Sequence, residues 1–407
     1  MVTLALGAGV FSFFAGAALL LALPGVDDDP EDRLFQLNTI LGSATMLAAF
    51  GAVLVYHAAS SLGRAPSAPV RQRIPWSLLL AFPLLIGLGQ LLILDPSAAP
   101  WLFPFVNIGI VAIPSVLIAA VCLRRYQAAN PWSWPMTWRE TVGAFGYGAI
   151  GAVLLAGIIN TAYLQIGGWL VLQWQDIDPG LDIQASLQEL PRTAGILFDL
   201  SALSLVAPLA EEFLKGLIVA LFFWRDGSAA RCFVWGVLAG TGFNLVETFA
   251  NSLALSDAQV IAAEGGAEQW WVFGVARAGA AAMHALAAGF AALAFFGLLN
   301  RRWPLVTGYL LAVLLHANWN AAVYLMAGDT ILSQSGPGSL ALALVGLAVL
   351  VTLATASVAL LWTMSGSIRD EAPAVIYRVL GMLPAGRATP PGVPLWLDRR
   401  LKTVKPA

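Results

Sequence analysis

Charged residues are scarce in this sequence, and their scarcity excludes most soluble folds. Only 11% of the 407 residues are Asp, Glu, Lys or Arg, whereas 59% are hydrophobic. Soluble globular domains carry about 25% charged residues. A chain this apolar cannot hide its hydrophobic side chains from water in a soluble core. Most of it must therefore lie in a lipid bilayer.

Cysteine is almost absent, and this excludes two further classes of protein. Cys122 and Cys232 are the only two cysteines, and they lie far apart in the sequence. Two such residues do not make a disulfide framework, and no Cys-x-x-Cys motif is present. Thiol redox chemistry and a cysteine-based zinc site are therefore unsupported.

Long apolar stretches are what the sequence has instead. A helix that spans a bilayer needs about 20 mostly apolar residues. The sequence predicts about ten such helices, at 2–23, 38–58, 75–94, 101–123, 141–172, 197–224, 232–253, 271–299, 303–326 and 338–363. We therefore expect an all-α fold, a polytopic membrane helix bundle with short loops.

The basic residues predict how this bundle is oriented. Seventeen of the 21 Lys and Arg residues fall in alternate loops and in the tail, at 64–73, 124–139, 225–231, 301–302 and 366–407. Basic residues concentrate in cytoplasmic loops. We therefore expect both termini to be cytoplasmic and the protein to be a multi-pass component of a bacterial-type plasma (inner) membrane.

The predicted helices group into four segments. Residues 1–195 hold the first five helices and an outer loop, and 196–326 hold the next four, which we interpret as a catalytic core. Residues 327–365 hold the last helix, and 366–407 form a short basic cytoplasmic tail.

Few ionisable residues remain at membrane depth once the loops are set aside. A charge at the centre of a spanning helix costs about 2.5–3.5 kcal/mol on the insertion scale, so such residues are functional by default. Here they occur in four consecutive predicted helices: Glu211, Glu212, Lys215, Glu247, Arg277, His284 and His316.

Helical spacing indicates how some of these residues are arranged. Lys215 follows Glu211 by four residues and Glu212 by three, so it can pair with either. Asn320 lies four residues after His316 and shares its helix face. We expect these polar stripes to face the interior of the bundle, where they can satisfy one another or hold water.

This set of side chains allows two kinds of hydrolysis. A Glu beside a His can supply a general base and a general acid to a water molecule. Alternatively, Glu212, Glu247, His284 and His316 can bind a divalent metal such as Zn2+, with a remaining Glu as the base. The sequence leaves both open.

The motifs of several known protease classes are missing, but one ordered set is present. There is no His-Glu-x-x-His and no Gly-x-Gly-Asp. Residues 211–215 match EExxK, residues 243–247 match FxxxE, and His284 and His316 follow in turn. This order resembles the PrsW-type intramembrane proteases, distant relatives of the CAAX-prenyl endopeptidases.

The resemblance implies a function and its partners. It implies cleavage of a membrane-anchored protein, such as an anti-sigma factor. It also implies that Glu211, Glu212 and His284 are the catalytic residues. Lys215, Glu247, Arg277, His316 and Asn320 would then support the site, with Arg277 interpreted as a counter-ion for a glutamate. The lipid bilayer is the other expected partner, and no nucleic acid is expected.

Two rival functions fit the same intramembrane charges. Glu, His and Arg also form the proton relays of proton-coupled transporters. Transporters, however, often have broken helices in two matching halves, whereas the charges here lie only in the sixth to ninth predicted helices. A non-catalytic membrane scaffold is the second rival, and degraded motifs would favour it.

Overall fold

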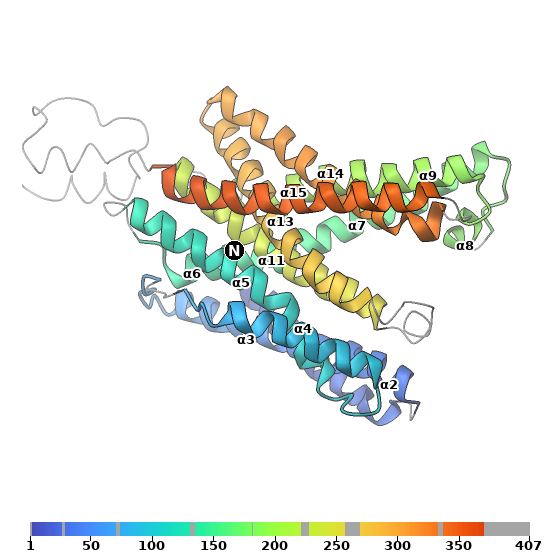
Figure 1. Cartoon of the computed structure of the whole chain (residues 1–407). Helices are drawn as coiled ribbons and strands as arrows, with labels where there is room; N and C mark the ends of the chain where they lie inside the picture. The colour runs from blue at the N-terminus through green and yellow to red at the C-terminus, as the bar shows by residue number, and fades with distance from the viewer. Residues whose placement is uncertain are drawn as a thin grey trace, which may run out of the picture. The chain divides into compact units, whose positions relative to one another are not determined.

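The described part of the chain is helical. A computed structural model describes residues 2–26, 29–70, 74–130, 135–180, 182–220, 228–256, 269–332 and 337–369. Within these ranges the elements are helices joined by short loops (Figure 1). The β-type pairing found there is an isolated antiparallel bridge between Pro69 and Thr137. From residue 370 onward, the predicted basic tail lies outside the described residues.

The helices follow one another along the chain with short breaks. The first half contains α1 (Val2–Leu19), η1 (Leu20–Gly25), α2 (Pro30–Leu37), η2 (Asn38–Gly42), α3 (Ser43–Leu62), α4 (Leu78–Leu94), α5 (Phe103–Ala129), α6 (Trp138–Gly146), η3 (Tyr147–Ala152) and α7 (Val153–Trp174). The second half contains α8 (Ile183–Leu187), α9 (Arg192–Ser201), η4 (Ala202–Val206), α10 (Ala207–Ile218), α11 (Ala229–Leu255), α13 (Gln269–Leu299), α14 (Trp303–Leu332) and α15 (Pro337–Ser367).

Nine helical stretches of the described chain are long and apolar enough to cross a membrane. They are Leu6–Gly25, Asp32–Leu62, Phe103–Ala129, Trp138–Trp174, Arg192–Ile218, Ala229–Leu255, Trp270–Leu299, Trp303–Met326 and Ala341–Ser367. The remaining predicted span, 75–94, is the shorter apolar helix α4 of 17 residues. At ~1.5 Å per residue, α4 is ~26 Å long. The all-α polytopic bundle is thus confirmed, while the cytoplasmic placement of the termini stays a prediction.

The helix that begins at Trp138 starts three residues before the predicted one. Thr137 accepts a hydrogen bond from the backbone N–H of Glu140, and the Glu140 carboxylate accepts one from the N–H of Thr137. This reciprocal pair is a capping box, which satisfies two backbone donors that a helix start would leave unpaired. The polar cap therefore extends the helix beyond its apolar part.

The chain divides into two compact units, and each draws on several segments. The first unit comprises Met1–Val121, Met136–Gly151 and Thr241–Ala282. In it, α1 packs closely on α3, because a Cβ atom on Gly51 would lie 2.6 Å from the carbonyl oxygen of Gly9. An apolar core lies between α2, α4, α5 and the start of α13: Leu34, Ile86, Leu92, Ile93, Phe103, Val106, Ile110 and Trp270.

The second unit comprises Cys122–Pro135, Ala152–Gly240 and Met283–Ala407. Small residues again allow close helix packing, as is usual between membrane helices. A Cβ atom on Gly346 of α15 would lie 2.7 Å from the carbonyl oxygen of Ala322 of α14. A Cβ atom on Gly236 of α11 would lie only 2.2 Å from the carbonyl oxygen of Ala288 of α13. This unit holds Glu211, Glu212, Lys215, His284 and His316.

Candidate metal centre

The continuous helical stretch Arg192–Ile218 carries the paired glutamates. It is built from α9, the π-helical turn η4 and α10. One face of α10 is buried and holds Glu211, Glu212 and Lys215, while Leu209 and Phe213 on the other face are exposed. The i, i+1, i+4 spacing of the three ionisable residues therefore places them together on the interior side, as the sequence predicts.

The π-helical turn η4 begins six residues before Pro208, the only proline of this helical stretch. Proline has no N–H and leaves a backbone carbonyl one turn earlier without its usual donor. The side chain of Asn320 on α14 donates to the carbonyl oxygen of Leu203 within this turn, at 2.7 Å. The hydroxyl of Tyr309, also on α14, donates to the carbonyl oxygen of Leu209 at 2.7 Å. These two bonds fasten α14 to the glutamate-bearing helix on both sides of His316.

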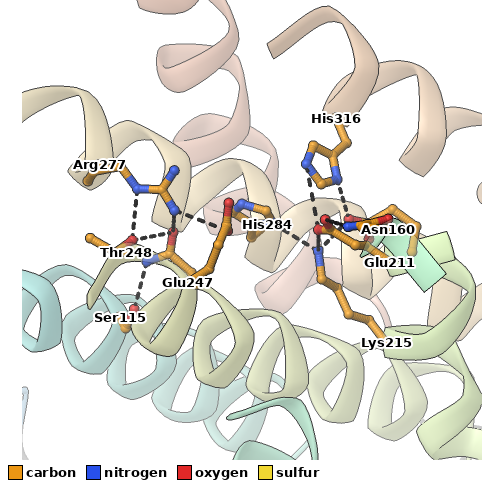
Figure 2. Close-up of polar contacts among 11 residues, drawn as sticks. Ser115, Asn160, Glu211, Lys215, Glu247, Thr248, Arg277, His284 and His316 are labelled. Carbon is orange, nitrogen blue, oxygen red and sulfur yellow. Dashed lines mark hydrogen bonds and ion pairs between the residues drawn. The ribbon is translucent and has the colours of Figure 1, made fainter. Parts of the chain in front are cut away.

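Lys215 lies at the centre of a buried ionisable cluster (Figure 2). Its Nζ atom is 2.7 Å from Oε1 of Glu212 and 3.4 Å from Oε2 of Glu211. The same Nζ atom is 2.9 Å from Nδ1 of His284. Nδ1 of His316 is 2.8 Å from Oε1 of Glu212, and the two imidazole rings lie with centroids 4.7 Å apart. The four side chains that the sequence marks on three helices thus form one cluster, in which Glu211, Glu212 and His284 contact the ammonium group and His316 joins through Glu212.

The cluster is closed to solvent within the protein. Glu212 and Lys215 are 0% exposed, His284 and His316 are 1% exposed, and Glu211 is 7% exposed. Charges this deeply buried are tolerated only when they are paired and hydrogen-bonded. Two carboxylates facing one ammonium leave one negative charge in excess, so the cluster favours a further cation or proton.

The hydrogen bonds indicate which imidazole nitrogens carry protons. An ammonium group can only donate, so Nδ1 of His284 accepts from Lys215 and its proton is assigned to Nε2. An ionised carboxylate can only accept, so Nδ1 of His316 donates to Glu212. Nε2 of a neutral His316 then carries a lone pair, and it lies 3.8 Å from Oε2 of Glu211.

Asn160 is a member of the cluster that the sequence reasoning missed. Its side-chain amide on α7 donates to Oε1 of Glu211 at 3.4 Å. The amide oxygen of Asn160 is buried and has no hydrogen-bond partner among the described residues. Asn160 and Gln165 are the amide side chains of the apolar stretch 141–172, and a criterion based on ionisable residues does not detect them.

A close helix contact positions His284. A Cβ atom on Gly240 of α11 would lie 2.3 Å from the carbonyl oxygen of His284 and 2.8 Å from the Cβ of Ala288, both on α13. Only a glycine permits this approach of the two backbones. The Ala-rich character of α13 continues the contact, since Ala285, Ala287 and Ala288 are fully buried.

Glu247 and Arg277 belong to the first unit and form a polar network there. Nη2 of Arg277 is 3.1 Å from Oε2 of Glu247, and Nε of Arg277 donates to the hydroxyl of Thr248 at 2.8 Å (Figure 2). Asn244 accepts from Arg277 at 3.5 Å and donates to the hydroxyl of Ser115 at 3.1 Å. Arg277 is thus placed as a counter-ion of a glutamate, and the role of Glu247 as a metal ligand stays a prediction.

Comparison with known proteins identifies the family of the chain. Residues 136–355 match the family model described as PrsW family intramembrane metalloprotease. The chain belongs to the PrsW family. The matched segment runs from α6 into α15, so it contains every residue of the buried cluster. No curated protein and no solved structure matches the chain in the other two comparisons.

Membership of the PrsW family confirms the resemblance that the ordered motifs carry. With the nine apolar helices, it makes the chain a multi-pass integral membrane protein and an intramembrane protease. The same finding favours the protease interpretation over the transporter and scaffold interpretations.

The buried cluster fits the metal that the family name implies. Glu211, Glu212, His284 and His316 each offer one donor atom, and these four atoms lie within 4.8 Å of one another. Oε2 of Glu212 is buried and has no hydrogen-bond partner among the described residues, which is rare for a polar atom unless an ion or water uses it. Glutamate oxygens and histidine nitrogens are common ligands of catalytic Zn2+. The donor set therefore suits a divalent metal.

Proposed function

We propose that this chain is a metal-dependent endopeptidase that hydrolyses a peptide bond of a membrane-anchored protein within the bilayer. Glu212, His284 and His316 are the proposed metal ligands, and Glu211 is the proposed general base. The observation that carries the proposal is the convergence of two glutamates and two histidines, with donor atoms within 4.8 Å, in the interior of a membrane protein of this family.

The metal would supply two things when bound. A bound Zn2+ polarises a peptide carbonyl and lowers the pKa of a bound water to about 7. Glu212 suits the ligand role because its buried Oε2 atom has no hydrogen-bond partner in the part of the chain that the structure describes. The neutral imidazole of His316 suits it because Nε2 keeps a lone pair while Nδ1 donates to Glu212. His284 could offer the lone pair of Nδ1 once the hydrogen bond from Lys215 to that atom is released.

Glu211 is the best-placed proton carrier of the cluster. It is the most accessible of the five side chains, at 7% exposed, and Asn160 holds one of its oxygens at 3.4 Å. Its other oxygen lies 3.4 Å from Lys215 and 3.8 Å from His316. Glu211 would accept a proton from the attacking water and return it to the leaving amine, as a base that becomes an acid. Asn160 would orient this carboxylate.

The surroundings of the site would control water. Inside a closed, low-dielectric site each charge acts more strongly than in water. Peptide hydrolysis consumes one water, so the site must admit water while it excludes bulk solvent. A buried cluster of charges inside an apolar protein is able to hold a few waters by hydrogen bonding.

The substrate class follows from the location of the site. A site at membrane depth reaches substrates whose cleaved bond lies in or next to a spanning helix. We therefore propose a single-pass membrane protein as the substrate, an anti-sigma-factor-like regulator by resemblance. The proposed location is a bacterial-type plasma membrane, where such regulators are anchored.

The test uses purified protein in proteoliposomes with a single-pass substrate. We expect cleavage by the wild type, loss of at least about a thousandfold with Glu212→Gln, and a similar loss with His284→Ala, since each removes a proposed metal ligand. Glu189→Gln and His57→Ala make the same chemical changes away from the site and should keep activity. Chelation should abolish cleavage, and added Zn2+ should restore it. Full activity of both site variants would contradict the proposed site.

A further inference from the structure

The Lys215 ammonium occupies the position in which the proposed function needs a metal. Lys215 is one of the largest fully buried side chains of the described protein. Its Nζ atom contacts Glu211, Glu212 and His284 at 3.4, 2.7 and 2.9 Å. These are three of the four residues whose donor atoms form the metal-binding group. One cationic group therefore already touches most of the donors that a metal would use.

Charge balance explains why a cation stands there. Glu211 and Glu212 are adjacent and face the same interior space, and two like charges in a low-dielectric site repel strongly. The ammonium has three N–H donors, which match the three acceptors around it. Without a metal, Lys215 therefore holds the glutamates and His284 together as a metal would, but through longer contacts.

The ammonium and a divalent ion cannot share these contacts. The contacts of Nζ measure 2.7 to 3.4 Å, whereas Zn2+ binds oxygen and nitrogen at about 2.0–2.2 Å. An ion that bound the same donors would lie close to the ammonium and repel it. A metal held by these donors would therefore compete with the contacts of Nζ.

We propose that Lys215 is a place-holding cation, which organises the ligand cluster in the metal-free protein and competes with the metal for it. This inference rests on the proposed function, because it concerns the same metal site. Lys215 is thereby a positioning residue: it preserves the site for the metal and lowers the metal affinity. A purely structural lysine would have the opposite effect, since its loss would damage the site and weaken metal binding.

Metal binding by charge variants tests the competition. Wild type, Lys215→Met and Lys215→Arg are purified in detergent, stripped with chelator and exposed to Co2+, whose visible absorption reports its coordination. Zn2+ is then added as a competitor to obtain its Kd. We expect Lys215→Met to bind Zn2+ at least about tenfold more tightly than wild type, because the repelling charge is gone. Lys215→Arg keeps the charge and serves as the matched control, with an affinity like that of wild type or weaker.

Thermal unfolding of the same samples tests the place-holding role. Metal-free Lys215→Met should melt at a lower temperature than metal-free wild type, because two buried carboxylates lose their counter-ion. Saturating Zn2+ should remove this difference. If Lys215→Met proves too unstable when metal-free, it is purified with Zn2+ present, and the Zn2+ dissociation rate is compared with that of wild type; slower release supports the proposal.

Each result separates this inference from the proposed function. Equal or weaker metal binding by Lys215→Met than by wild type overturns the place-holding role but leaves the metalloprotease intact. Absence of metal binding by both proteins overturns the place-holding role and the metal-dependent mechanism together. Metal binding by Lys215→Met alone, or tighter binding by it, supports the place-holding role.

Discussion

Gly240 offers a test of how helix packing positions His284, a proposed metal ligand. A methyl group at this position would lie 2.3 Å from the carbonyl oxygen of His284, whereas ordinary van der Waals contacts begin near 3.4 Å. The backbone of α13 must therefore move by about 1 Å at His284, or α11 must bend, to accommodate Gly240→Ala. The substitution leaves every ionisable side chain of the site unchanged.

This displacement should lower both the stability of the protein and its rate of cleavage. Overpacking of this kind costs about 1–3 kcal/mol of folding free energy. A shift of about 1 Å in a catalytic group can cost about a hundredfold in rate. We therefore expect kcat/KM for a single-pass substrate in proteoliposomes to fall about a hundredfold in Gly240→Ala, with a lower melting temperature.

Two matched substitutions separate misplacement of His284 from general instability. Gly236→Ala, one turn away on α11, would place a methyl group 2.2 Å from the carbonyl oxygen of Ala288, so it should lose similar stability but less activity. Gly157→Ala on α7 meets nothing within 4 Å and should keep activity and gain about 0.5–1 kcal/mol of stability. Wild-type activity and stability in Gly240→Ala would refute the reasoning, and so would equal activity losses at Gly236 and Gly240.

Three other substitutions probe the supports of the site. Asn320→Leu removes the side chain that donates to the carbonyl oxygen of Leu203. In cleavage assays kcat/KM should fall about tenfold, and the melting temperature should fall slightly. An unchanged cleavage rate would exclude a positioning role for Asn320. Asn160→Leu removes a hydrogen bond to Oε1 of Glu211 and should lower kcat more than it raises KM, which substrate-dependence curves would show; a change confined to KM would speak against orientation of the base. Arg277→Met removes the cationic partner of Glu247 and should lower stability by about 1–3 kcal/mol, whereas Arg277→Lys should recover part of this; equal melting temperatures would argue that the ion pair contributes nothing.

The spans and the ionisable members of the site could be predicted because lipid imposes a simple rule. A polar group at membrane depth is costly, so few are present, and those present report function. Glu211, Glu212, His284 and His316 stand out on this ground alone, and their donor atoms lie within 4.8 Å of one another in the structure. The pairing of Lys215 with both glutamates likewise follows from helical spacing and is observed.

Other features depend on contacts between distant segments and carry no local signal. The contact of Lys215 with His284 joins residues 69 positions apart. Position 240 requires glycine because the backbone of α13 lies against it. The chain has 39 glycines, and the sequence alone does not indicate which of them lies at such a contact. The helix start at Trp138 did have a local signal, the Thr137 and Glu140 capping box, but an apolar-stretch criterion does not detect it.

Metal stoichiometry tests the central claim, that Glu212, His284 and His316 hold one metal ion beside Glu211, most directly. The wild type and a Glu212→Gln/His316→Ala double variant are purified, loaded with Zn2+, washed and analysed by elemental mass spectrometry. We expect about one Zn2+ per chain in the wild type and almost none in the double variant, because two of the proposed ligands are lost. Stoichiometric Zn2+ in the double variant, or a fully active wild type that holds no metal, would contradict this account.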